Sequence, residues 1–148
     1  MSVEPSRVNL SGQRARVPLV LQTEAAECGL ACLAMVAGAH GLGTDLRQLR
    51  LRFRVSMKGA TAADLVDMAT GLGLSSRALR AEPEQLGQLA LPSVLHWDMN
   101  HFVVLVSVRR GVATLHDPAR GIRRMRLAEL SPHFTGVVLE LQPSAGFE

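Results

Sequence analysis

The sequence predicts an α+β fold in which helices from the first half of the chain pack on an antiparallel sheet built from the second half. The 148 residues are 47% hydrophobic, which is enough for one compact core. Before Pro92 the apolar residues recur mainly at helical spacing, whereas after it short β-branched or alternating runs are separated by turn residues. Because helices and strands occupy separate halves, this architecture is favoured over alternating βαβ units.

Two helices are expected near the start of the domain. The segment Cys28–His40 is almost wholly apolar and rich in Ala, Leu and Met, which is typical of a helix buried on most sides. Thr44 can cap a second helix that ends near Arg54. In that second helix Arg47 and Arg50 are expected to face outward, opposite an apolar stripe.

A third helix and a short helical turn are expected before the strand-rich half. Thr61 and Asp64 have the spacing of a capping box, and an apolar stripe follows them up to Gly71. The segment Glu82–Leu89 is expected to add a helical turn, with Pro83 tolerated at its start.

Five strands are expected after these helices. The sequences Arg110-Gly111 and Ala119-Arg120-Gly121 are typical of tight connections between neighbouring strands. A meandering antiparallel sheet is therefore the simplest arrangement. The expected strands are Ser93–Trp97, Phe102–Arg109, Val112–His116, Ile122–Leu127 and Gly136–Leu141.

The composition indicates one folded domain, residues 16–142, with a flexible segment 1–15 before it and a short tail 143–148 after it. The N-terminus lacks the basic start and apolar segment of a signal peptide, so a reducing cytosol is expected. The longest uncharged run, Cys28–Ala39, falls well short of the roughly 18 residues that a membrane span needs. The two cysteines are therefore expected to be free thiols in a soluble piece.

The charge distribution predicts a positive edge on the sheet. The net charge is only +3, but six arginines fall within one stretch of two expected strands and their connections. This patch is a solvated strand face, or it faces anionic lipid headgroups or an acidic partner. A nucleic acid is not expected, because the chain has no tyrosine and no basic motif interleaved with aromatics. The arginines are Arg109, Arg110, Arg120, Arg123, Arg124 and Arg126.

Cys28 is the candidate nucleophile, because it lies where the first helix is expected to begin. The free N–H groups of a first helical turn, together with the helix dipole, favour a thiolate at that position. A buried structural cysteine is the alternative, and Cys32, one turn further along, is interpreted in that way. A metal site made by both cysteines and a histidine is a further hypothesis, since residues four apart share a helix face.

His101 is the candidate base, because it begins a strongly apolar strand. His96, at the end of the preceding strand, has a similar position and remains a candidate. Asp117 ends the next strand and can orient the imidazole if adjacent strands bring the two together, although Asp117-Pro118 is also typical of a turn. Gln22 precedes the nucleophile helix, where a side-chain amide can stabilise an oxyanion.

Three segments of the chain, in order, resemble bacteriocin-processing cysteine peptidases, which form the N-terminal domain of ATP-driven exporters of the colicin-V type. The resemblance implies a papain-like fold with Cys28 as nucleophile and His101 as base. It further implies that Asp117 orients the imidazole and that Gln22 is the oxyanion glutamine. Glu27 departs from the aspartate that often precedes this cysteine and is given no role. The segments are Gln22–Met35, His96–Leu105 and His116–Gly121, within residues 17–141.

By this resemblance, the protein is expected to remove a leader peptide after a Gly-Gly pair while the exporter moves the remaining peptide across the membrane. The Cys28 thiolate would attack the carbonyl of the second glycine, His101 would protonate the leaving amine, and water would release the leader. No metal or organic cofactor is implied in this domain, and ATP is expected elsewhere in the exporter, because the sequence has no GxxxxGK[ST] loop.

The implied partners are the leader peptide and the transmembrane and nucleotide-binding domains of the same exporter. The implied location is the cytoplasmic face of the bacterial inner membrane, with residues 143–148 leading to the transmembrane domain. A similar domain of haemolysin-type exporters has lost its nucleophile and only holds the substrate; Cys28 argues against that alternative. Trp97 and Met99, just before His101, are expected to narrow the groove so that only glycine fits.

Overall fold

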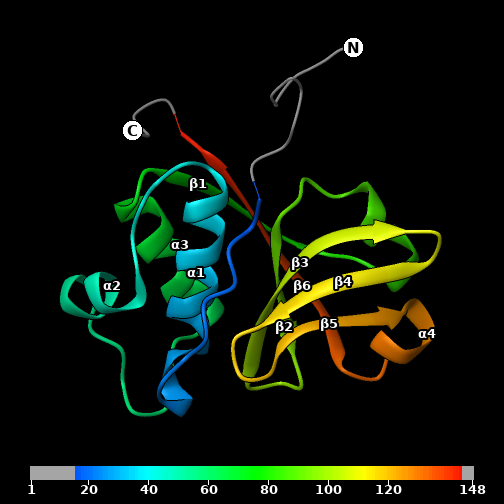
Figure 1. The fold of residues 1–148 in the computed structure, drawn as a ribbon, viewed down its shortest axis with the longest axis horizontal. Coiled ribbons are helices and arrows are strands. Elements are labelled where there is room, and N and C mark those ends of the chain that lie inside the picture. The colour runs from blue at the N-terminus through cyan, green and yellow to red at the C-terminus, as the bar shows by residue number, and fades with distance from the viewer. Residues whose placement is uncertain (1–15, 145–148) are drawn as a thin grey trace.

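The computed structural model describes residues 16–144, which form three helices gathered on one side of an antiparallel sheet (Figure 1). The predicted α+β class is confirmed. The expected flexible segment 1–15 and residues 145–148 of the expected tail lie outside the described residues. Within residues 16–144, no helix combines the length and the apolar character that crossing a membrane requires.

Helix α1 (Cys28–Ala39) is the central helix of the domain. Its residues Cys28–Ala37 are all buried, as its composition predicted. The short 3₁₀ helix η1 (Ala25–Glu27) leads directly into it, so that the chain turns sharply just before Cys28.

Helices α2 (Leu46–Arg52) and α3 (Ala62–Gly71) pack beside α1. The expected capping box of α3 is confirmed: the Thr61 hydroxyl accepts a hydrogen bond from the Asp64 amide at 3.1 Å. The expected cap of α2 is wrong by one residue, because the Asp45 carboxylate, not Thr44, accepts the Gln48 amide at 2.8 Å.

Six strands form a single sheet with the order β1-β6-β2-β3-β4-β5. The expected meander is confirmed for β2 through β5, which pair in sequence order. The meander is wrong for β6, which pairs with β2 on one side and with β1 on the other instead of lying beside β5. The strands are β1 (Leu74–Arg80), β2 (Ser93–Trp97), β3 (His101–Arg109), β4 (Val112–Asp117), β5 (Gly121–Arg126) and β6 (Phe134–Pro143).

Two short elements cover the other side of the sheet. The expected helical turn is confirmed as the 3₁₀ helix η2 (Pro83–Gln88). The one-turn helix α4 (Leu127–Leu130) was not predicted. Strand β5 is an edge strand, so Arg123, Arg124 and Arg126 lie at one edge of the sheet, as the charge distribution predicted.

Two hydrophobic clusters flank the sheet, and β3 contributes to both. Phe102 and Val104 pack with the helices, whereas Val103 and Leu105 pack in the cluster that includes Leu86 of η2 and Leu130 of α4. Fully burying a side chain of this size contributes roughly 1.5–3 kcal/mol. Strand β3, which begins at His101, is therefore anchored on both faces.

Candidate active site

Cys28 is the first residue of α1 and only 5% of it is exposed. Its predicted position at a helix start is confirmed. Cys32, one turn further along, is completely buried, and both thiols are free. Burial raises the pKa of Cys32 well above its ordinary value, and the nearby negative charges of Cys28 and Asp117 raise it further. Cys32 therefore has the character of a core residue.

His101 begins β3, and its Nε2 lies 2.8 Å from Asp117 Oδ1. Burial alone would lower the pKa of His101, but hydrogen bonds to Asp117 and Cys28, together with the charges of those two groups, raise it to about 9. Because Nε2 is engaged by the carboxylate, Nδ1 is the ring nitrogen left for the thiol. The structure thus brings the three predicted residues together, with His101 in the middle.

Asp117 is the last residue of β4, and its side chain is 4% exposed. Its Oδ1 also accepts the Ala119 amide at 2.9 Å, while its backbone carbonyl accepts the Arg120 amide. Burial by itself would raise the pKa of Asp117, but these hydrogen bonds and the charges of His101 and Arg123 lower it. Asp117 therefore has both of the roles considered from the sequence: it forms the turn after β4, and it binds the imidazole of His101.

Gln22 lies in the segment before η1, beside the turn that follows β4. Its backbone amide donates to the Pro118 carbonyl at 2.9 Å. Its side-chain Nε2 donates to the carbonyls of Glu24 at 3.1 Å and Ala25 at 3.4 Å, and its buried Oε1 has no hydrogen-bond partner among the described residues. Both N–H groups of Nε2 are used by these carbonyls, so its longer hydrogen bond, to Ala25, has to break before Nε2 can donate to an oxyanion.

His96, the second candidate base, and Trp97, expected to narrow the groove, both make structural contacts instead. His96 Nδ1 lies 2.9 Å from the Thr135 hydroxyl, and the His96 ring packs against Phe102. The expectation that Trp97 narrows a groove is wrong, because Trp97 is buried in the sheet's second cluster and stacks on His133. Met99, by contrast, is 76% exposed.

The hypothesis of a metal site at Cys28 and Cys32 needs a third ligand beside the two cysteines. Within the part of the chain that the structure describes, no three His, Cys, Asp or Glu side chains lie together so as to hold a metal ion. A site on Cys28 and Cys32 therefore lacks a third ligand among these residues.

Sequence reasoning missed Glu27 and its partner Arg50. Glu27 immediately precedes the nucleophile and is buried, and its Oε2 lies 2.5 Å from Arg50 Nε. The expectation that Arg50 faces outward is confirmed, since its side chain is 46% exposed, but the sequence did not show that its guanidinium also binds this carboxylate. The signal that could have identified Glu27 is its spacing from Glu24, which is that of a capping box at a helix start. Nothing local identified Arg50, which lies 23 residues further along the chain.

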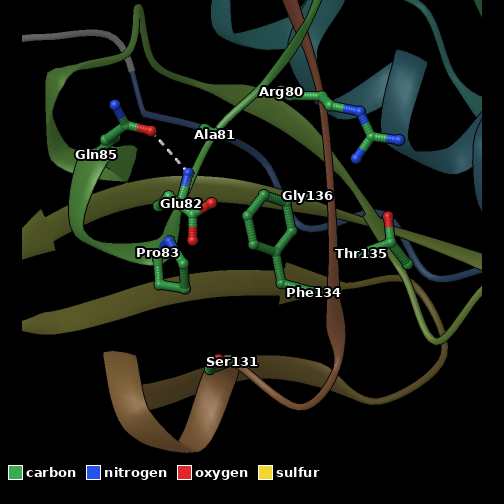
Figure 2. A pocket seen from close by; sticks show the side chains of 9 residues that line it. All are labelled: Arg80, Ala81, Glu82, Pro83, Gln85, Ser131, Phe134, Thr135 and Gly136. Carbon is green, nitrogen blue, oxygen red and sulfur yellow. Dashed lines mark hydrogen bonds between the residues drawn. The ribbon is translucent and has the colours of Figure 1, made fainter.

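A pocket of about 280 Å³ opens between η2 and the start of β6 (Figure 2). Arg80, Glu82 and Phe134 are among its lining residues, and Gln85 at its rim accepts the Glu82 amide at 2.7 Å. None of the predicted site residues lines it, so this pocket is separate from the candidate site.

An α+β fold that sets a cysteine at a helix start against a histidine–aspartate pair is that of a papain-like cysteine peptidase. The chain belongs to the Peptidase C39 family, which it matches over residues 16–146.

The chain is similar to parts of two much longer proteins of Escherichia coli. It is 52% identical, over 95% of its length, to the colicin V secretion/processing ATP-binding protein, and 52% identical, over 90% of its length, to the probable microcin-H47 secretion/processing ATP-binding protein. It spans about a fifth of the length of each, 20% and 19% respectively.

Solved structures show the same fold. A double glycine motif protease from an AMS/PCAT transporter, crystallised in complex with the leader peptide, is similar with a TM-score of 0.82 and 38% identity, covering 88% of this chain and 94% of that one. The peptidase domain of Streptococcus ComA, a bifunctional ABC transporter, is similar with a TM-score of 0.80 and 26% identity, covering 87% of this chain and all of that one.

Proposed function

We propose that this chain is a cysteine endopeptidase that removes the leader of a bacteriocin-like precursor by cleaving after a Gly-Gly pair. The observation that carries the proposal is the position of His101, bound to Asp117 on one side and next to Cys28 on the other. Membership of the Peptidase C39 family and the likeness to a double glycine motif protease support this choice of substrate.

In the proposed first step, His101 Nδ1 takes the thiol proton and the Cys28 sulfur adds to the carbonyl carbon of the second glycine. The tetrahedral intermediate collapses as the C–N bond breaks, and His101 gives its proton to the leaving amine. The product peptide departs, and the leader remains bound to Cys28 as a thioester. Asp117 keeps the imidazole oriented throughout, because its Oδ1 holds Nε2.

In the second step, His101 takes a proton from water, which attacks the thioester and releases the leader with a free carboxyl group. Both tetrahedral intermediates carry a negative oxygen. The backbone amide of Cys28 and the Gln22 side chain are the proposed donors to that oxygen. The proximity of Gln22 to the turn after Asp117 supports this role, since one hydrogen bond joins the two segments.

We further propose that residues 16–142 act as the peptidase domain of an ATP-driven exporter at the cytoplasmic face of the bacterial inner membrane, with residues 143–148 leading toward its transmembrane domain. The names of the E. coli relatives, which describe secretion, processing and ATP binding, support this setting. ATP would be bound by another domain of that exporter.

Mass spectrometry of a double-glycine leader peptide after incubation with the domain tests the proposal. We expect two products, separated after the second glycine. A peptide that binds but stays intact would instead support the alternative of a binding module that holds its substrate without cleaving it.

A further inference from the structure

Glu27 is an unusual carboxylate, because it is 94% buried directly before the candidate nucleophile and is surrounded by donors. Its Oε1 accepts the Thr23 hydroxyl at 2.7 Å, the Glu24 amide at 3.1 Å and the Thr23 amide at 3.2 Å. Its Oε2 accepts Arg50 Nε. A buried carboxylate with this many donors fixes the backbone around it.

The charge of Glu27 is held by these contacts. The hydrogen bond from Arg50, opposed by burial and assisted by Thr23 and Glu24, lowers the pKa of Glu27 to about 2. Glu27 is therefore ionised at neutral pH, and its hydrogen bonds are charge-assisted.

Arg50 links this carboxylate to a different element. It lies on α2, and besides binding Glu27 its Nη2 donates to the Thr23 hydroxyl at 3.0 Å. The Thr23 hydroxyl is thus hydrogen-bonded to both Arg50 and Glu27. Through the Arg50–Glu27 ion pair, α2 is connected to the segment that leads into α1.

Thr23 directly follows Gln22, the proposed oxyanion donor. On its other side Gln22 is held by the Pro118 carbonyl, next to Asp117. The Gln22 backbone is thus fixed between the turn that carries Asp117 and the Glu27–Arg50 pair. Its side-chain amide, which bonds to the carbonyls of Glu24 and Ala25, depends on the same segment.

We propose that Glu27 and Arg50 are positioning residues for the oxyanion site, holding the Thr23–Glu24 segment so that the Gln22 amide and the Cys28 backbone amide face the same point. This inference rests on the proposed function, because it assumes a Cys28 that acylates. Neither residue touches the substrate; both act through Gln22 and the backbone before Cys28.

Two small reagents separate this role from a general effect on stability. p-Nitrophenyl acetate acylates a thiolate: the sulfur–carbonyl bond forms, the carbonyl oxygen becomes an oxyanion, and nitrophenolate leaves. Iodoacetamide alkylates the same thiolate by displacing iodide from a saturated carbon, so that no oxyanion forms. Only the first reaction needs the oxyanion donors.

The experiment measures both rates at Cys28, located by peptide mapping, in wild type, Glu27→Gln and Arg50→Gln. We expect acylation to fall about tenfold in both variants, because displaced donors lose part of the roughly 10²-fold or greater contribution of an oxyanion hole. Alkylation should stay within about twofold of wild type, since it does not use those donors. Arg50→Lys, which keeps the charge, should retain more acylation than Arg50→Gln.

Arg77→Gln and Glu140→Gln are matched controls, because Arg77 and Glu140 form an ion pair at 3.8 Å between β1 and β6, on strands that contribute no site residue. Both controls should acylate like wild type. The inference would be overturned if Glu27→Gln were acylated as fast as wild type, or if the acylation and alkylation rates fell equally. It would also be overturned if wild type were alkylated but never acylated. No leader peptide is used, so a wild type that acylates normally but leaves leader peptides intact overturns only the proposed function.

Discussion

Replacing Asp117 by asparagine removes one negative charge from His101 while keeping a planar side chain of the same size. The oxygen that holds His101 Nε2 at 2.8 Å can still be supplied by the amide, so the imidazole keeps an acceptor. What is lost is the charge that favours the protonated ring. We therefore expect a folded protein with a weaker base.

The pKa of His101 sets the size of this effect. Burial lowers that pKa, and the bonds and charges of Asp117 and Cys28 raise it from 6.5 to about 9, a difference of about 2.5 units. At roughly 1.4 kcal/mol per pKa unit, the upper bound on the stabilisation is about 3.5 kcal/mol. Asp117 provides only part of it, and the side chain of His101 is 18% exposed, so about 1–2 kcal/mol is expected to disappear in Asp117→Asn.

The sign of the pH dependence follows from the raised pKa. The folded state binds the His101 proton more tightly than the unfolded state does, so this stabilisation is fully present below about pH 6.5 and is lost as the pH rises through about 9. The difference in unfolding free energy between wild type and Asp117→Asn should therefore be largest near pH 6 and should shrink toward pH 10.

Two assays measure these quantities. Denaturant unfolding at pH 6 and pH 10 gives the stability difference, and leader cleavage between pH 5 and pH 10 gives the alkaline limb of turnover. We expect that limb to move to lower pH by about one unit, with turnover reduced by roughly tenfold to a hundredfold, because a Cys-His-Asn arrangement also works in papain-like peptidases. An alkaline limb and a turnover that both match wild type would refute the role of Asp117.

Three further predictions concern the nucleophile, the oxyanion donor and the substrate. Iodoacetamide at neutral pH should label Cys28 well before Cys32 and abolish cleavage, because Cys32 is fully buried and its burial raises its pKa; equal labelling would argue against an activated Cys28. Gln22→Ala should lower turnover by about 10²-fold with little change in KM, whereas a raised KM alone would point to substrate binding instead. Leaders with valine in place of either glycine should resist cleavage and still inhibit cleavage of the natural leader, because valine adds bulk at Cβ and restricts the backbone; efficient cleavage after valine would contradict the double-glycine assignment.

The parts of the structure that the sequence predicted are those set by local composition or by neighbouring strands. The apolar run after Cys28 marked a buried helix, and the helix start follows from the change in composition at Glu27. His101 and Asp117 lie on adjacent antiparallel strands joined by a short turn, which brings them near each other, although the shift of register between Leu105 and Ser107 was not predicted. This is why the candidate site was largely predictable.

The parts that were missed depend on distant segments. Strand β1 has no β-branched residue and forms because β6 pairs with it along seven positions, from Leu74 with Pro143 to Arg80 with Val137. Trp97 was expected to narrow the groove because its neighbours in sequence did not show that both faces of β2 are covered, so that Trp97 packs in the second cluster. The contact between Glu27 and Arg50 likewise joins two helical segments whose relative position the sequence pattern does not specify.

The role of the Cys28 thiol is tested by comparing wild type with Cys28→Ala on one double-glycine leader peptide under identical conditions. Circular dichroism and thermal unfolding of both proteins would establish that the variant folds, which is expected because Cys28 and Ala are both small. Wild type should give a single scission after the second glycine, and Cys28→Ala should leave the peptide intact. Cleavage at the same bond by Cys28→Ala, at a rate comparable to wild type, would show that the Cys28 thiol does not perform the reaction.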